Sequence, residues 1–275
     1  MSYSKTLYWW IAQRFKDKLR MNPDMKVVDL QEYVMKKNTE LRLVDYCYEL
    51  KRSNPGTTVA MQVDPLADGK NMFNTVGRDA NNQIYPIAWA VVQVENTENW
   101  EWFLQHLRQD LDLNDGTRVA RISNGHKGII QAVMRVVPNV KHRLCARHIY
   151  ANFCKKYGGV VFRNLFWASS KATNHDKWMH IMGQLKEVNE EAHQYLIERE
   201  PKLWCRSFFK VGVDCDVVEN GLSESFNSHI RIARRKPILG LFEDIKCYVM
   251  QRNATLRKEC EKWEDDICPN IRKVL

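Results

Sequence analysis

The sequence predicts an α/β fold with a large helical part. Runs of β-branched and apolar residues alternate with amphipathic helical patterns between about residues 57 and 150. Helical periodicity then continues from residue 158 to residue 204, and two further helical patterns follow it. With 275 residues, 44% of them hydrophobic, the chain can bury a sizeable core.

Four segments follow from these patterns. Residues 1–56 read as short amphipathic helices that end at the turn signal Asn54-Pro55-Gly56. Residues 57–157 form the predicted α/β core, residues 158–216 a helical insertion, and residues 217–275 the C-terminal helices.

The first half of the core is predicted as two strands and a helix. TTVAMQV, residues 57–63, is rich in β-branched residues, and IYPIAWAVVQV, residues 84–94, is apolar enough for a buried strand. Thr97 is the predicted N-cap of the helix that follows. The apolar residues of this helix share one face, and they are Trp100, Phe103, Leu104, Leu107 and Leu111.

The second half of the core predicts two strand–helix units. A strand over Arg118–Ser123 leads into a helix over Lys127–Val137, which Pro138 ends. HRLCARHIYANFCKK reads as a short strand that enters a helix. In the C-terminal segment one helix is predicted through GLSESFNSHIRIARR, and Pro237 opens a last long one.

The charge balance leaves two interpretations open. Lys and Arg total 42 against 33 Asp and Glu, a net charge of +9. This excess suits a polyanionic partner such as DNA, and it also suits ordinary solubility. The eight cysteines are scattered without a CxxC pair, and no apolar run approaches the roughly 20 residues that span a bilayer. We therefore expect free thiols, a soluble intracellular protein and no membrane partner.

Three groups of polar residues are candidate sites. Glu224 shares a helix face with Asn220 and Asn227, so the face is either a cation site or simply solvated. Cys145 and His148 have a spacing that zinc accepts, but a structural site takes four ligands and no second pair is near in sequence. We therefore expect no zinc there, and a buried cysteine beside a satisfied histidine is the alternative. The cations Arg231, Arg234, Arg235 and Lys236 favour the C-terminal end of a helix and also offer a phosphate-binding patch.

Several motifs in order resemble a known family. GRDANNQIYPIAWAVVQVENTENWEWFLQHLRQDL, ISNGHKGI, HRLCARHIYANF and ENGLSESFNSHIRIARRKPI together resemble the Mutator-like element (MULE, MuDR-type) transposases of plants. The resemblance extends from WIAQRFKDKLRMNP to the last helix. It implies a ribonuclease-H-like fold with an all-helical insertion, and nuclear localisation. It also implies a DDE active site in which three carboxylates hold two Mg²⁺ or Mn²⁺ ions that cut and join the DNA of the element's terminal repeats.

The resemblance carries over unevenly to this chain. Glu224 matches the third acid, Asn124 stands at the position of the second acid, and the strand that bears the first acid is absent. The gap implies an internal deletion joined near Phe73 and Asn74. Because the missing strand is central in that fold, we expect an incomplete sheet in the remnant core, with helices better formed than strands.

These departures predict a catalytically inactive, transposable-element-derived protein without a cofactor in this form. Asp64 is a substitute acid if the TTVAMQV strand takes the vacant position, and Asp79 is the other acid close to the junction. A domesticated nuclear module that binds DNA or protein is one alternative. An active transposase, which holds Mg²⁺ or Mn²⁺ and whose sequence is incomplete here, is the other.

Overall fold

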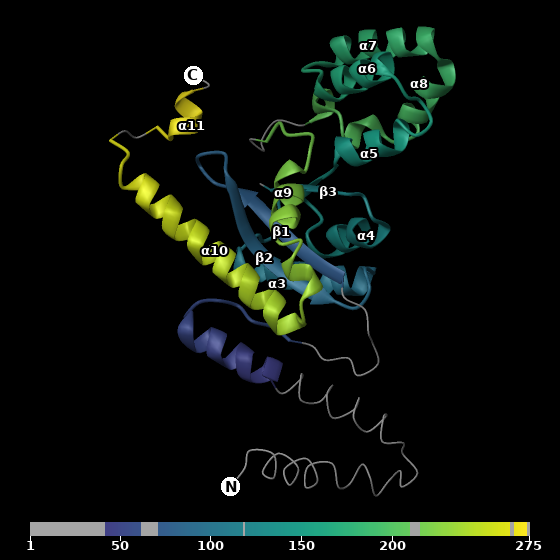
Figure 1. Cartoon of the computed structure of the whole chain (residues 1–275). Helices are drawn as coiled ribbons and strands as arrows, with labels where there is room; N and C mark the ends of the chain where they lie inside the picture. The colour runs from purple at the N-terminus through teal and green to yellow at the C-terminus, as the bar shows by residue number, and fades with distance from the viewer. Residues whose placement is uncertain (1–41, 62–70, 118, 210–214, 265–266, 274–275) are drawn as a thin grey trace, which may run out of the picture. The chain divides into compact units, whose positions relative to one another are not determined.

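A computed structural model describes residues 42–61, 71–117, 119–209, 215–264 and 267–273 (Figure 1). The chain divides into two compact units, residues 1–66 and 67–275. In the described part of the first unit, residues 42–53 are helical and residues 57–61 have no regular structure. The strand predicted for residues 57–63 is therefore wrong over residues 57–61. A β-branched run forms a strand when a neighbouring strand accepts its hydrogen bonds, and the described residues supply none here.

The second unit begins with an antiparallel strand pair. β1 (Asn71–Arg78) pairs with β2 (Ile84–Val92) from Asn71 opposite Val92 to Arg78 opposite Ile84. The turn between them is closed by the carboxylate of Asp79, which accepts the N–H groups of Asn81 and Gln83 at 2.9 and 2.7 Å. The predicted apolar strand over residues 84–94 is confirmed as β2.

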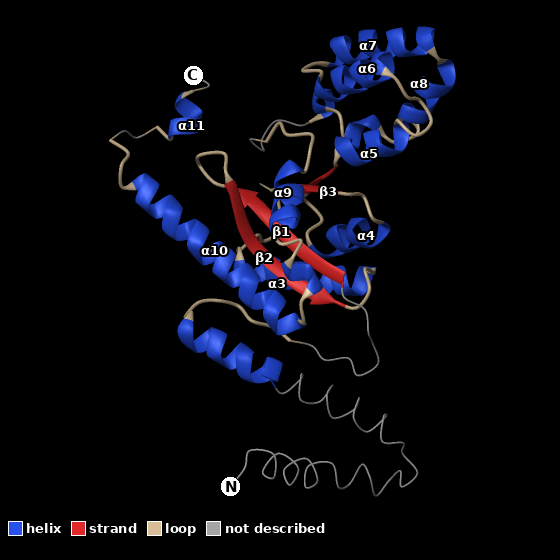
Figure 2. Ribbon diagram, viewed as in Figure 1, coloured by secondary structure: helices blue, strands red, loops and turns tan. Residues whose placement is uncertain are grey.

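A parallel strand pair follows, joined through a helix. β3 (Ala120–Ser123) leads through α4 (Lys127–Val136) to β4 (Lys141–Leu144), and Ala120 lies opposite Lys141. The four described strands therefore form two separate two-stranded sheets (Figure 2). The expectation that the described strands do not form one full sheet is confirmed.

Helices cover both faces of the β1–β2 pair. Phe73 of β1 is buried on one face and stacks on Trp100 of α3 (Thr97–Asp110), with ring centroids 3.6 Å apart. On the other face Met72 and Val76 pack against the apolar side chains of the C-terminal helices. This alternation along β1 follows from the two-residue period of a strand.

Two details of α3 correct the sequence analysis. The N-cap is Asn96, whose side chain accepts the Asn99 N–H at 2.8 Å, and not Thr97. An amide oxygen caps a helix at least as well as a hydroxyl, and Thr97 instead hydrogen-bonds Gln131. Leu111 is the C-cap residue, just after the last residue of α3, and its side chain is exposed. The helix therefore ends before Leu111 can join its buried face.

The middle of the chain forms a helical block. Its elements are α5 (Ala146–Phe153), α6 (Val160–Lys171), α7 (His175–Val188), α8 (Glu190–Ile197) and two short 3₁₀ turns at Pro201–Leu203 and Arg206–Phe208. They share one core, in which Phe153, Phe166 and Trp204 are fully buried. The helical reading of residues 158–204 is confirmed.

The C-terminal part contains α9 (Gly221–His229), a 3₁₀ turn (Ala233–Arg235), α10 (Ile238–Cys260) and α11 (Pro269–Arg272). The helix predicted through Arg235 ends earlier than expected, at His229. The turn that follows brings Ile230 and Ala233 into one buried cluster with Ile245 of α10. No described helix is long and apolar enough to cross a membrane.

Candidate functional site

Glu224 is held in place by the packing of α9 on the β1–β2 pair. Phe226, two residues further on, is fully buried in the cluster that joins α9, α10 and the strands. Asn227 accepts a hydrogen bond from Asn74 of β1 at 3.0 Å. These contacts fix the first turn of α9, from which the half-buried side chain of Glu224 projects.

Cys145 and His148 reach the same point from the junction of β4 and α5. The N–H of Cys145 donates to Ser123 O at 2.9 Å, which ties this junction to the end of β3. The Cys145 thiol is fully buried, and its sulfur accepts the Asn220 N–H at 3.2 Å. His148 lies one helical turn further along α5.

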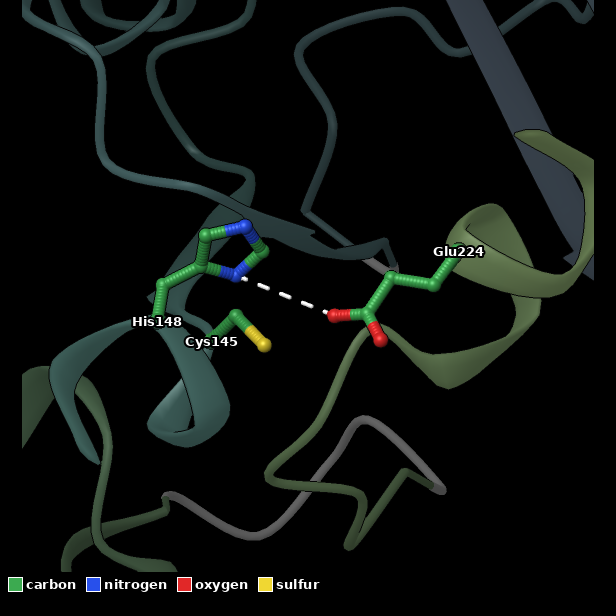
Figure 3. Close-up of side chains that lie close together, drawn as sticks. All are labelled: Cys145, His148 and Glu224. Atoms are coloured by element: carbon green, nitrogen blue, oxygen red, sulfur yellow. Dashed lines mark ion pairs between the residues drawn. The ribbon is translucent and has the colours of Figure 1, made fainter. Parts of the chain in front are cut away.

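Figure 3 shows that these three side chains converge. The ligand atoms of Cys145, His148 and Glu224 all lie within 4.8 Å of one another. Nδ1 of His148 is 4.0 Å from a carboxylate oxygen of Glu224, is buried, and has no hydrogen-bond partner. The sequence suggested the Cys145–His148 pair and Glu224 as separate candidates, and the fold brings them together.

Arg147 forms ion pairs with Glu224 of this cluster and with a neighbouring carboxylate, that of Glu219. Its Nη1 lies 2.8 Å from Glu224 Oε2 and its Nη2 lies 2.7 Å from Glu219 Oε2, while Lys171 Nζ lies 3.7 Å from Glu219 Oε1. The hydrogen bond to Glu219, and then the charges of both carboxylates, raise the pKa of Arg147. Glu224 therefore already has a permanent cationic partner through one of its oxygens.

A pocket of about 480 Å³ opens next to Arg147. Three cations, two aromatic rings and one carboxylate line it, namely Arg147, Arg163, Lys171, Tyr150, Trp167 and Glu219. The ammonium of Lys171 lies 5.0 Å from the ring centre of Trp167. This pocket was not predicted from the sequence. The available signal was the four-residue spacing of Arg163, Trp167 and Lys171, which places all three on one face of α6.

The predicted basic patch lies just after α9. Arg231, Arg234 and Arg235 are exposed, and within the described ranges none of them forms an ion pair. Lys236 is exposed too, but its Nζ pairs with Asp244 at 2.7 Å. Three of the four predicted cations therefore remain available to an external anion.

The comparison with protein families bears on this geometry. The family model of the MULE transposase domain matches residues 67–152. This match supports a MULE-type transposase family, and it contains Asn124, Cys145 and His148 but not Glu224. No curated protein matches the chain.

Asn124, which the resemblance implies stands at the position of the second acid, is engaged locally. It follows β3, is exposed, and its side-chain oxygen accepts the His126 N–H at 3.2 Å. Asp79 is likewise occupied by the turn between β1 and β2, and Asp64 lies outside the described residues. Among the described His, Cys, Asp and Glu residues, those grouped with Glu224 are Cys145 and His148, and Asp79 is not one of them.

The donors around Glu224 do not fit the pair of Mg²⁺ or Mn²⁺ ions that a DDE site requires. Those ions prefer carboxylates, and a two-metal site needs several to balance its charge. In the part of the chain that the structure describes, the atoms grouped with Glu224 are a sulfur and an imidazole nitrogen. Among the described residues, this donor set therefore does not match a site for two Mg²⁺ or Mn²⁺ ions.

Proposed function

We propose that this chain is a transposase-derived DNA-binding protein that neither cuts nor joins DNA. The observation that carries the proposal is the pocket in which Arg147, Arg163 and Lys171 surround aromatic rings. Cationic side chains bind the phosphates of a nucleic acid, and aromatic side chains beside them stack on its bases. The match of residues 67–152 to the MULE transposase domain makes DNA the natural polyanion.

The proposal that the chain does not cut DNA is based on the residues at the positions of the catalytic acids. An amide at Asn124 offers an oxygen to a metal but no negative charge. Glu224 shares one carboxylate oxygen with Arg147 and lies beside a thiol and an imidazole. A single carboxylate of this kind does not balance two divalent cations.

The same proposal gives an origin for the divided sheet. Two separate two-stranded sheets agree with a ribonuclease-H-like sheet that lacks its central strand. A deletion joined near Phe73 and Asn74 would remove that strand, and it would remove the first acid with it. The proposed DNA target is the terminal repeat of the parent element, and the proposed compartment is the nucleus.

A pair of matched charge variants tests DNA binding through the pocket. Arg163→Ala combined with Lys171→Ala removes two pocket cations, whereas Lys177→Ala combined with Lys202→Ala removes two exposed cations of the same helical block. Affinity for a labelled duplex is measured by fluorescence anisotropy over a salt series in EDTA. We expect the pocket variant to bind more weakly and to lose about one unit of salt slope per phosphate contact removed.

The control variant should keep the wild-type slope. If both variants weaken binding equally, the pocket is not the contact surface and the effect is one of net charge alone. If the wild-type chain shows no salt-dependent binding, the DNA-binding proposal is wrong.

A further inference from the structure

The cluster of Cys145, His148 and Glu224 is better suited to a different metal from the one that the transposase resemblance implies. We propose that it binds one Zn²⁺ ion through the Cys145 sulfur, His148 Nδ1 and one Glu224 oxygen, with the fourth position open to water or another ligand. The inference goes beyond DNA binding and does not depend on it.

The three donor atoms of the cluster are a sulfur, an imidazole nitrogen and a carboxylate oxygen. Zn²⁺ accepts thiolate, imidazole and carboxylate ligands together, whereas Mg²⁺ takes oxygen ligands. Spacing alone disfavoured zinc because Cys145 and His148 supply two donors. The fold adds the third donor from a segment 76 residues beyond His148, since Glu224 projects from α9 toward α5 (Figure 3).

The imidazole of His148 has an unsatisfied nitrogen that a cation would pair with. Nδ1 of His148 is a buried polar atom without a hydrogen-bond partner, and it faces Glu224 from 4.0 Å. A buried nitrogen without a hydrogen-bond partner destabilises the fold unless something pairs with it. A cation between the imidazole and the carboxylate removes that cost.

Neighbouring groups support the Cys145 and Glu224 ligands. The Asn220 N–H donates to the Cys145 sulfur at 3.2 Å, as an outer-shell group does for a metal-bound thiolate. Arg147 holds Glu224 Oε2 at 2.8 Å and leaves Oε1 directed toward His148. Each oxygen of the carboxylate therefore has a distinct role, and the ion needs one of them.

The required movement is small. Ligands of tetrahedral zinc at ordinary bond lengths lie roughly 3.3–3.6 Å apart. The three donors already lie within 4.8 Å of one another, so a closure of about 1 Å by side-chain rotation completes the site. Both backbone segments stay fixed while this happens, because Cys145 N–H is bonded to Ser123 O and α9 is packed on the strands.

Cobalt substitution in the full chain tests the site. After EDTA treatment and buffer exchange, the wild-type protein is titrated with Co²⁺ and then with Zn²⁺. We expect about one equivalent of Co²⁺ to give a sulfur-to-cobalt charge-transfer band with intense visible bands of tetrahedral cobalt, and Zn²⁺ to displace it.

Variants assign the ligands. Cys145→Ser should abolish the charge-transfer band, whereas Cys154→Ser, at the other end of α5, should keep it. His148→Asn and Glu224→Gln should weaken Zn²⁺ binding by more than the roughly 10- to 100-fold that outer-shell changes cost, and His180→Asn should not.

The proposal is overturned if the wild-type chain gives no band, if Cys145→Ser keeps it, or if Cys154→Ser loses it equally. Circular dichroism checks that each variant folds. If Cys145→Ser does not fold, unchanged Zn²⁺ affinity in His148→Asn and Glu224→Gln overturns the proposal. Because DNA binding is measured in EDTA, failure of one proposal is distinguishable from failure of the other.

Discussion

The helical block of α5–α8 and the strand region of β1–β4 differ in how their elements are held together. The block has one continuous core in which Phe166 and Trp204 are fully buried and stack with ring centroids 5.2 Å apart. The strands form two separate pairs. Buried side-chain atoms without a hydrogen-bond partner occur in both regions, such as Thr75 Oγ1 and Arg121 Nε among the strands and His148 Nδ1 and Ser207 Oγ in the helical block.

This difference has a simple physical source. An α-helix makes its backbone hydrogen bonds within four residues, so a helical block can remain intact when another part of the chain changes. A strand takes its hydrogen bonds from neighbours that are distant in sequence, and each described strand has one neighbour instead of two. The proposed loss of a central strand would therefore weaken the sheet and leave the helices almost untouched.

Two titratable side chains of the parallel pair β3–β4, Arg121 and His142, have lowered pKa values. Arg121 of β3 lies opposite His142 of β4, and burial lowers the pKa of Arg121 to about 10. Burial, and then the charge of Arg121, lower the pKa of His142 to about 4. His142 is therefore neutral near pH 7. Its Nε2 forms a hydrogen bond of 2.8 Å with Ser123 Oγ.

The largest expected effect lies in the helical block. Trp204→Ala removes a fully buried indole whose Nε1 donates to Arg199 O at 3.0 Å, so we expect a loss of about 3–5 kcal/mol in the free energy of unfolding. Urea denaturation followed by circular dichroism measures it. Val160→Ala, at an exposed position of α6, is the control and should change stability by less than about 0.5 kcal/mol. Equal effects would show that the block has no tight core.

Acid pH should act on the strand region next. Because the folded-state pKa of His142 lies below its unfolded value, its contribution to stability is complete above about pH 6.5 and is lost as the pH falls toward 4. We expect a loss of about 2 kcal/mol, less than the roughly 3 kcal/mol of the full shift, because partial exposure screens it.

Thermal unfolding between pH 7 and pH 4 measures this loss, and His142→Gln should reduce it. His193→Gln in the helical block is the matched control. Burial lowers the pKa of His193 as well, but that residue lies outside the strand region. A pH profile that His142→Gln leaves unchanged would contradict the assignment.

A gain of stability is expected at Arg121. Arg121→Met removes a buried guanidinium nitrogen that has no partner, and it keeps an unbranched side chain beside Trp100. We expect the free energy of unfolding to rise by about 1–2 kcal/mol. Denaturant unfolding of the variant measures this change. A loss of stability would mean that the Arg121 guanidinium makes favourable interactions in the strand region.

The smallest expected effects are equal in the two regions. Asn96 caps α3 and Asn174 caps α7, each through a hydrogen bond of 2.8 Å to the third residue beyond it. Asn96→Ala and Asn174→Ala should each cost about 1 kcal/mol, because capping is local. Unequal costs would show that the regions differ in local helix stability as well as in sheet completeness.

The sequence predicted the elements that depend on local signals. Periodicity and Pro138 placed α4 within one residue of its observed end, and the apolar run from Ile84 predicted β2. The strand predicted over residues 57–63 is wrong over residues 57–61, because strand pairing depends on a distant neighbour. The end of α9 also failed, because burial of Ile230 against α10 decides where the chain turns.

Some features of the candidate site could likewise be predicted from local sequence signals, and others could not. The spacing of Cys145 and His148 was visible because both lie on one helical turn, and Glu224 was visible through its motif. Their convergence depends on how α9 packs on the strands, which no local pattern records. The basic pocket was missed because cations at helical spacing look like an ordinary solvated face.

One assay tests most directly the claim that the chain binds DNA but does not cut it. The full chain is titrated into a labelled duplex in EDTA and again in Mg²⁺ or Mn²⁺ at constant ionic strength, and each sample is then run on a denaturing gel. We predict the same salt-dependent binding with and without the metal, and intact DNA throughout. Metal-dependent nicking that Glu224→Gln abolishes would contradict this account.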